Sequence, residues 1–300
     1  MPSAPVTSDT SRKGLVAGLG AFALWGLLPL YWKQLLDVPP FEILCHRILW
    51  SFVFLLPVVV FSGRWAEVRA AVRDRGTLLR VACSGLLVGF NWYLYIWAVN
   101  TGHVLETSLG YYINPLMNVA LGCVFLRERP SRLQVAAIAL AAFGVLWMLA
   151  GYGRFPWVAL TLAGSFSLYG FMRKTVKVAS VPGLFIETSI LAPFVAVWLV
   201  RLHLGGGGAF MHLAPTTDLL LMGAGVATST PLIWFAFAAR SLRLTTVGVL
   251  QYLAPTLAFM LGVFVFHEPL TPSHLVTFGC IWGALALYTI EGWRALHRKP

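Results

Sequence analysis

Long apolar stretches separated by short polar segments dominate the pattern of this chain. A helix needs about 20 consecutive, mostly apolar residues to cross the hydrocarbon core of a bilayer, which is roughly 30 Å thick. Ten stretches meet this requirement: 14–35, 41–61, 78–98, 104–125, 133–150, 154–173, 181–200, 217–239, 245–266 and 271–291. The pattern therefore predicts an all-α membrane protein with ten transmembrane helices.

Two connections between these stretches are longer than the others. Residues 62–77 are basic and have an amphipathic pattern, which predicts a helix on the membrane surface. Residues 201–216 include the run from Gly205 to Gly208, which predicts a flexible loop.

Composition agrees with a lipid environment, because 58% of the 300 residues are apolar and only 11% are charged. A soluble domain carries about 25% charged residues. Ten spans place both termini on one side of the membrane. If that side is the cytoplasm, 18 of the 22 Lys and Arg residues lie in inner segments, three lie in outer loops, and Arg47 lies within a span. The positive-inside rule then predicts cytoplasmic termini. The net charge of +11 follows from this topology, so no nucleic-acid partner is expected.

The sequence repeats itself at an offset of 140 residues. Residues 85–150 align with 225–290 without a gap, and the alignment pairs Tyr112 with Tyr252 and Pro115 with Pro255. Because five spans is an odd number, a second copy must cross the membrane in the opposite direction. We therefore predict two inverted repeats, residues 1–151 and residues 152–300. In secondary transporters such repeats hold the substrate near the bilayer midplane, at the interface between them.

Pro115 and Pro255 both lie near the middle of their spans. Proline removes a backbone donor and leaves a carbonyl group free one turn earlier. Within lipid, such groups persist only where they are buried in protein or line a wet cavity. The prolines therefore indicate a cavity or gate between the halves, although a kink that serves packing alone is the alternative.

Polar and aromatic side chains gather beside these prolines and on one face of the third span. Tyrosine, tryptophan, amide and hydroxyl groups suit a small amphipathic solute, whereas aromatic residues at the membrane interface are the alternative interpretation. The predicted substrate-binding residues are Trp25, Asn91, Trp92, Tyr95, Ser108, Tyr111, Tyr112, Asn114, Tyr169, Gln251 and Tyr252.

Charged residues inside spans usually face the bundle interior and have a partner. Glu42 and His46 are one helical turn apart, and histidine titrates near neutral pH. We predict that these groups form a gate, contact a charged part of the substrate or couple transport to protons, with an ion-paired helix end as the alternative. The predicted gating or coupling residues are Glu42, His46, Arg47, Glu106, Pro115, Glu187 and Pro255.

Motifs of enzyme chemistry are not found in the sequence. His267-Glu268 lacks the second histidine of a zinc-protease motif, and the four cysteines form no CxxC pair. We expect no catalytic residue, no metal ion and no cofactor.

Three stretches resemble the RarD-like branch of the EamA family, in the drug/metabolite transporter superfamily. They are EILCHRILWSF (42–52), GFNWYLYIWAVN (89–100) and LETSLGYYINPLMNVALGCVFLRER (105–129). The superfamily includes YddG-type amino-acid exporters. The resemblance implies a ten-helix permease of the bacterial inner membrane, alternating access between the halves, and export of amino acids or similar metabolites.

Other functions remain open at this stage. The chain could be a drug permease of the chloramphenicol-sensitivity type, or a membrane scaffold or receptor that binds a partner through residues 62–77. A membrane-embedded lipid enzyme has the least support. For partners we expect a small-molecule solute and the lipid bilayer, in a monomer or weak homodimer.

Overall fold

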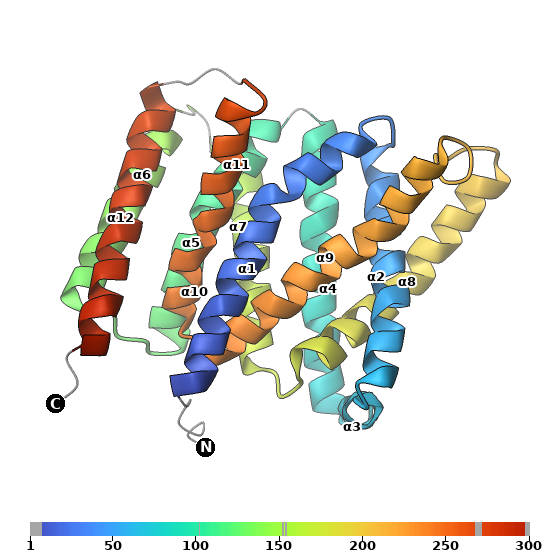
Figure 1. Cartoon of the computed structure of the whole chain (residues 1–300), viewed down its shortest axis with the longest axis horizontal. Coiled ribbons are helices and arrows are strands. Elements are labelled where there is room, and N and C mark those ends of the chain that lie inside the picture. Colours follow the sequence, from blue (N-terminus) through green and yellow to red (C-terminus); the bar gives the residue numbers. More distant parts are fainter. Residues whose placement is uncertain (1–7, 102, 152, 154, 268–271, 298–300) are drawn as a thin grey trace.

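The computed structural model describes residues 8–101, 103–151, 153, 155–267 and 272–297, and most of them are helical (Figure 1). The helices are α1 Ser8–Trp32, the 3-10 turn η1 Lys33–Leu35, α2 Pro40–Phe61, α3 Trp65–Arg73, α4 Arg75–Asn100, α5 Val104–Phe125, α6 Arg132–Ala150, α7 Trp157–Thr175, α8 Ser180–Leu204, α9 Pro215–Ser241, α10 Leu244–Gln251, α11 Leu253–Phe264 and α12 Pro272–His297. This described part contains no β-strand, and the predicted all-α class is confirmed.

Eight segments of the described residues are long and apolar enough to cross a membrane, and α10 with α11 counts as one of them. Helices α5 and α7 are not among the eight. These two helices pack against each other inside the bundle and carry buried polar residues such as Asn114, Asn118 and Ser167 (Figure 1). A helix that packs mainly against protein needs less apolar surface than one that faces lipid. The chain is therefore a multi-pass membrane protein, and the number of ten spans stays a prediction.

The principal helix contacts form pairs between the two halves of the chain. Helix α1 packs on α9, and α4 packs on α7; likewise α2 packs on α9, and α4 packs on α8. Three further pairs, α2 with α8, α5 with α10 and α6 with α12, each join one helix from either half. The bundle is thus built from contacts that reach across the chain, so neither half encloses a core alone.

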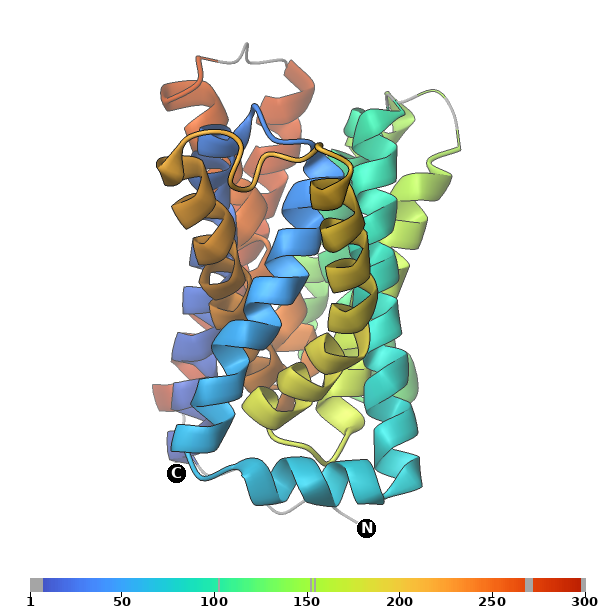
Figure 2. The same ribbon diagram turned by 90° about the vertical axis from the view of Figure 1, so that its right-hand side faces the viewer.

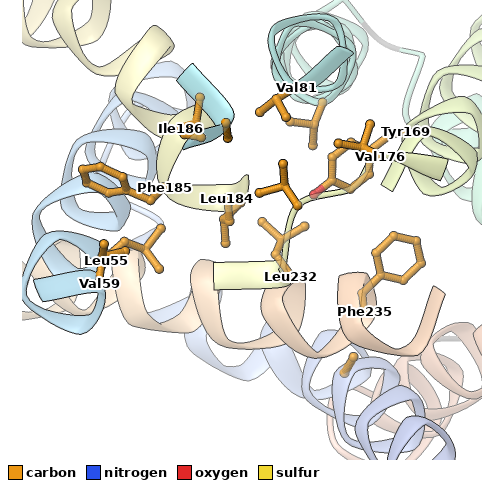
Figure 3. Packing of buried hydrophobic residues seen from close by; sticks show 14 of the residues in the cluster. Leu55, Val59, Val81, Tyr169, Val176, Leu184, Phe185, Ile186, Leu232 and Phe235 are labelled. Carbon is orange, nitrogen blue, oxygen red and sulfur yellow. The ribbon is translucent and has the colours of Figure 1, made fainter. Parts of the chain in front are cut away.

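The largest cluster of buried apolar side chains lies toward one end of this bundle (Figure 3). It includes Leu55 and Val59 near the end of α2, Val81 near the start of α4 and Leu184 near the start of α8. Helix α1 begins and α12 ends on this side, which we call the termini side (Figure 1).

Both long connections between the spans form defined contacts with the bundle. Helix α3 lies across the termini side of the bundle, where residues 62–77 were expected to form a surface helix (Figure 2). The loop 205–214 lies at the opposite end, within the connection 201–216 that the sequence predicts to be flexible. Ala209 N and Phe210 N donate hydrogen bonds of 2.7 and 3.3 Å to Glu42 Oε1, so this part of the loop contacts α2.

One close helix approach depends on a glycine. A Cβ atom at Gly225 of α9 would lie 2.3 Å from the backbone carbon of Trp50 and 2.7 Å from Ser51 N, both in α2. The hydroxyl of Ser51 donates to the carbonyl of Gly225 over 3.2 Å. Small residues allow helix backbones to come this close in membranes, and van der Waals packing and hydrogen bonds then hold them.

We predict that Gly225→Ala destabilises the protein by about 1–3 kcal/mol, because the added methyl group overlaps the backbone of α2. The midpoint of thermal unfolding in detergent measures this change. Gly279→Ala is the matched control, since a Cβ atom there meets no other atom within 4 Å. Equal midpoints for the two variants would contradict the close approach of α2 and α9.

Candidate functional site

A cationic and aromatic group of residues lies in the half of the bundle away from the termini side. Arg47 of α2 donates from Nε to the hydroxyl of Thr228 in α9 over 2.9 Å. Its guanidinium carbon lies 4.8 Å from the ring centre of Trp32 and 5.4 Å from that of Trp92. Tyr95, one turn after Trp92 in α4, lies 6.2 Å from Tyr111 of α5, measured between ring centres. We call these six residues the Arg47 cluster; they come from α1, α2, α4, α5 and α9.

The members of the Arg47 cluster differ in exposure: Thr228 is buried, and Trp32, Arg47, Trp92 and Tyr95 are half-buried. The side chain of Tyr111 is 53% exposed, whereas its neighbour Tyr112 is 9% exposed. The rings of Tyr111 and Tyr95 are 6.2 Å apart, so the exposed face of α5 is the one that turns toward α4 and Arg47. Ser108, one turn before Tyr111, is exposed as well. This face of α5 is therefore not covered by protein.

A buried hydrogen-bond network joins α7, α5 and α10 beside Pro115. Ser167 Oγ donates to Asn114 Oδ1 over 2.9 Å, and Asn118 Nδ2 donates to Gln251 Oε1 over 2.6 Å. Asn118 Nδ2 also lies 3.3 Å from Asn114 Oδ1. Two of the predicted substrate-binding residues, Asn114 and Gln251, are thus occupied by protein partners in this conformation.

The two prolines have different local effects. Pro115 lies within the continuous helix α5, whereas the backbone breaks at Tyr252, between α10 and α11, three residues before Pro255. The hydroxyl of Tyr252 donates to the carbonyl of its repeat equivalent Tyr112 over 3.3 Å. A recess beside Pro115 and Tyr252 is lined mainly by apolar side chains, so it does not suit a polar solute.

Trp25 and Tyr169 lie in a packed aromatic cluster with Phe22, Phe166 and Phe235. The ring of Tyr169 is fully buried and stacks on Phe235 at 6.0 Å (Figure 3). The structure therefore separates these two predicted residues from the Arg47 cluster. Together they form part of the core on the termini side.

A buried ion pair reinforces that core. Glu187 of α8 accepts hydrogen bonds from Ser84 Oγ over 2.5 Å and from the Tyr169 hydroxyl over 3.3 Å. Arg173 Nη1 lies 3.4 Å from Glu187 Oε1, and Arg173 is fully buried. The guanidinium packs on Gly183, where a Cβ atom would lie 2.1 Å from Nη1. This network ties α4, α7 and α8 together.

The other predicted acidic residues also bind backbone or side-chain donors. Glu106 accepts a hydrogen bond of 2.9 Å from Val158 N and so caps the N-terminus of α7. Glu42, which holds the loop 205–214, lies 3.8 Å from His46 Nε2. Trp50 Nε1 donates to His46 Nδ1 over 3.2 Å, so a neutral His46 carries its proton on Nε2.

Asn91 donates to Leu162 O and Ser165 Oγ and so joins α4 to α7 instead of facing an open space. Sequence reasoning missed several partners, namely Ser84, Asn118, Ser167, Arg173 and Thr228. Arg173 is one of the 18 cations that the charge count places in inner segments, and the sequence contains no sign that it folds back on Glu187. Asn118 lies one turn after Asn114, and that spacing was a usable signal.

Comparison with known proteins gives the family. A model of the EamA-like transporter family matches residues 12–150. An uncharacterised transporter of Bacillus subtilis, YojE, is 45% identical over 286 residues, which cover 94% of this chain and 95% of the relative. Protein RarD of Escherichia coli is 41% identical over 281 residues, covering 94% and 95% of the two chains.

A more distant relative and a solved structure are also similar to this chain. The chloramphenicol-sensitive protein RarD of Pseudomonas aeruginosa is 31% identical over 293 residues, covering 96% of this chain and 97% of the relative. One crystal structure shares the fold with a TM-score of 0.70 at 19% identity, over 93% of this chain and 98% of that chain.

A bundle of membrane-spanning helices with an accessible polar group inside it, and full-length relatives named as transporters, define a membrane transporter. The chain belongs to the EamA-like transporter family of the drug/metabolite transporter superfamily, and within it to the RarD-like proteins.

We predict that Arg173→Met and Glu187→Met each destabilise the protein by about 3–5 kcal/mol, because each leaves a buried charge without its partner. The double variant removes both charges and should be more stable than either single variant. Thermal unfolding in detergent measures this order. Lys13→Gln, which breaks the exposed pair with Asp9, is the control and should change stability by about 1 kcal/mol or less. A double variant weaker than both singles would contradict this account.

Proposed function

We propose that this protein is a secondary transporter of the bacterial inner membrane that exports small amphipathic metabolites, amino acids first, by alternating access. The observation that carries the proposal is the contrast between the two ends of the bundle. The Arg47 cluster is accessible, with Tyr111 53% exposed, whereas the termini side is closed by buried apolar residues and by the Glu187–Arg173 pair. Catalysis forms no part of the proposal.

Our proposed topology is ten spans in two inverted repeats, residues 1–151 and 152–300, with both termini in the cytoplasm. If each helix is replaced by its equivalent in the other repeat, the contact of α1 with α9 becomes the contact of α7 with α4. The pairs α2–α8 and α6–α12 stay the same under this replacement. This two-fold pattern of helix contacts supports the repeats. The basic helix α3 on the termini side supports a cytoplasmic location, because Lys and Arg concentrate there. A labelling test of engineered cysteines in the loops checks this orientation.

In this scheme the conformation described is open to the outside and closed to the cytoplasm. The transport cycle then requires a second conformation in which the Arg47 cluster closes and the Glu187 network opens. Packed interfaces of this kind switch between discrete arrangements and do not deform continuously. The protein acts as a monomer or weak homodimer in this proposal, since the Arg47 cluster is formed within one chain.

Two alternatives remain as outcomes of the transport test. One relative is named for chloramphenicol sensitivity, which favours drug uptake as the second candidate. A scaffold or receptor would show no solute flux, and its partner would bind the basic helix α3.

We predict that proteoliposomes containing the protein release labelled amino acids faster than empty liposomes. Trp92→Ala and Tyr95→Ala should lower this efflux roughly 10-fold or more, because a large buried contact with the solute is lost. Phe143→Ala, which changes an exposed side chain of α6, is the control and should leave efflux unchanged. Flux of chloramphenicol alone would favour the drug permease. No flux of any solute would reject transport.

For energy coupling, we propose that the Glu42–His46 pair carries a proton. The two side chains are buried, and both Glu42 Oε2 and His46 Nε2 lack a hydrogen-bond partner among the described residues. We predict that His46→Gln abolishes the stimulation of efflux by a pH gradient but preserves exchange of labelled for unlabelled solute. Wild-type efflux that is indifferent to the gradient would reject proton coupling.

A further inference from the structure

We infer that Arg47 binds the carboxylate of the transported solute, and that the site is built for a monoanionic group attached to an apolar or aromatic body. The inference rests on the proposed transport function and adds the chemical class of its substrate. It assigns Arg47 to substrate binding, one of the roles that the sequence leaves open beside gating and proton coupling.

The first argument is charge. Arg47 lies seven residues inside α2, about 10 Å from the helix start at 1.5 Å per residue. Charges at such depth usually have a partner. Among the described residues no carboxylate lies within ion-pair distance of Arg47. By contrast, the buried Arg173 has Glu187. A mobile anion would supply the missing charge at Arg47.

The second argument is the state of the guanidinium donors. Arginine has five N–H groups in a planar fork that matches a carboxylate with two parallel hydrogen bonds. Of these donors, Nε is directed to Thr228, which fixes the plane of the group. Within the described residues, no hydrogen-bond acceptor is recorded for the two terminal nitrogens, and Arg47 is only partly buried. The paired donors are therefore available to a solute.

The third argument is the surroundings of the charge. Trp32 and Trp92 cover the guanidinium, and the paired rings of Tyr95 and Tyr111 come from the same helix as Trp92 and from α5. These rings offer apolar surface to the body of a solute and hydroxyl groups to a polar substituent. One cation neutralises one negative charge, so a monocarboxylate fits better than a dianionic phosphate. Buried anions without full compensation are costly.

The experiment measures binding by isothermal titration calorimetry to purified full-length protein in nanodiscs. The probes are the amphipathic L-amino acids, their amides, benzoate, benzamide and inorganic phosphate. We expect at least one carboxylate to bind saturably. Its amide, which lacks the negative charge of the carboxylate, should bind roughly 10- to 100-fold more weakly. Inorganic phosphate should not compete. Amides that bind as tightly as their acids, or carboxylates that do not bind at all, would overturn the inference.

Variants separate a binding role from a structural one. Arg47→Gln should reduce carboxylate binding by the same 10- to 100-fold and leave amide binding unchanged, and Arg47→Lys should retain part of the affinity. Arg201→Gln removes one exposed positive charge near the end of α8 and serves as the control, for which we expect unchanged binding. If Arg47→Gln does not fold, Thr228→Val tests the same geometry, because it frees the guanidinium plane. Equal losses for acid and amide would show that Arg47 only stabilises the fold.

Flux distinguishes failure of this inference from failure of the proposed function. If proteoliposomes transport amides as fast as acids, transport stands and the carboxylate site is rejected. If carboxylates bind with the stated dependence on Arg47 but no solute crosses the membrane, the site stands and the transport proposal fails.

Discussion

Every polar group inside a membrane bundle must find its partner within the protein, because lipid offers neither donor nor acceptor. Most of the described polar side chains obey this constraint through contacts between distant segments. Glu187 binds Arg173, Ser84 and Tyr169, and Asn118 binds Gln251. Each of these contacts fixes one helix against another. The polar groups therefore gain their hydrogen-bond partners only when the helices pack together.

Arg47 differs from the acidic residues of the bundle in the partners that surround it. Glu106 caps a helix and Glu42 binds a loop backbone, so both carboxylates accept hydrogen bonds from backbone N–H groups. Arg47 has a hydroxyl and two indole rings around it. In our proposal the carboxylate of the solute supplies the negative charge that this partly exposed cation lacks.

The halves of the chain are similar in sequence yet different in packing. Pro115 lies in a continuous helix, whereas the chain breaks three residues before Pro255. Tyr169 is buried in an aromatic core, and the Arg47 cluster stays open. The proposed alternating access requires such an inequality, because a passage open at both ends would let the solute leak.

Hydropathy alone determined that this chain is a helical membrane protein, since the need for apolar spans is a local property of 20 or so residues. The 140-residue offset likewise predicted which positions correspond, and Tyr252 does contact Tyr112. Tertiary structure alone decided which polar residues are available. Asn91 and Asn114 read as binding residues in the sequence, but helix packing gives them partners in α7. In the sequence, Arg47 is one of several charged residues within spans. In the structure, no carboxylate of the described residues forms an ion pair with it. The reason is physical: a hydrogen bond between helices depends on which faces meet, and the bonds named here join residues about 50 to 180 positions apart.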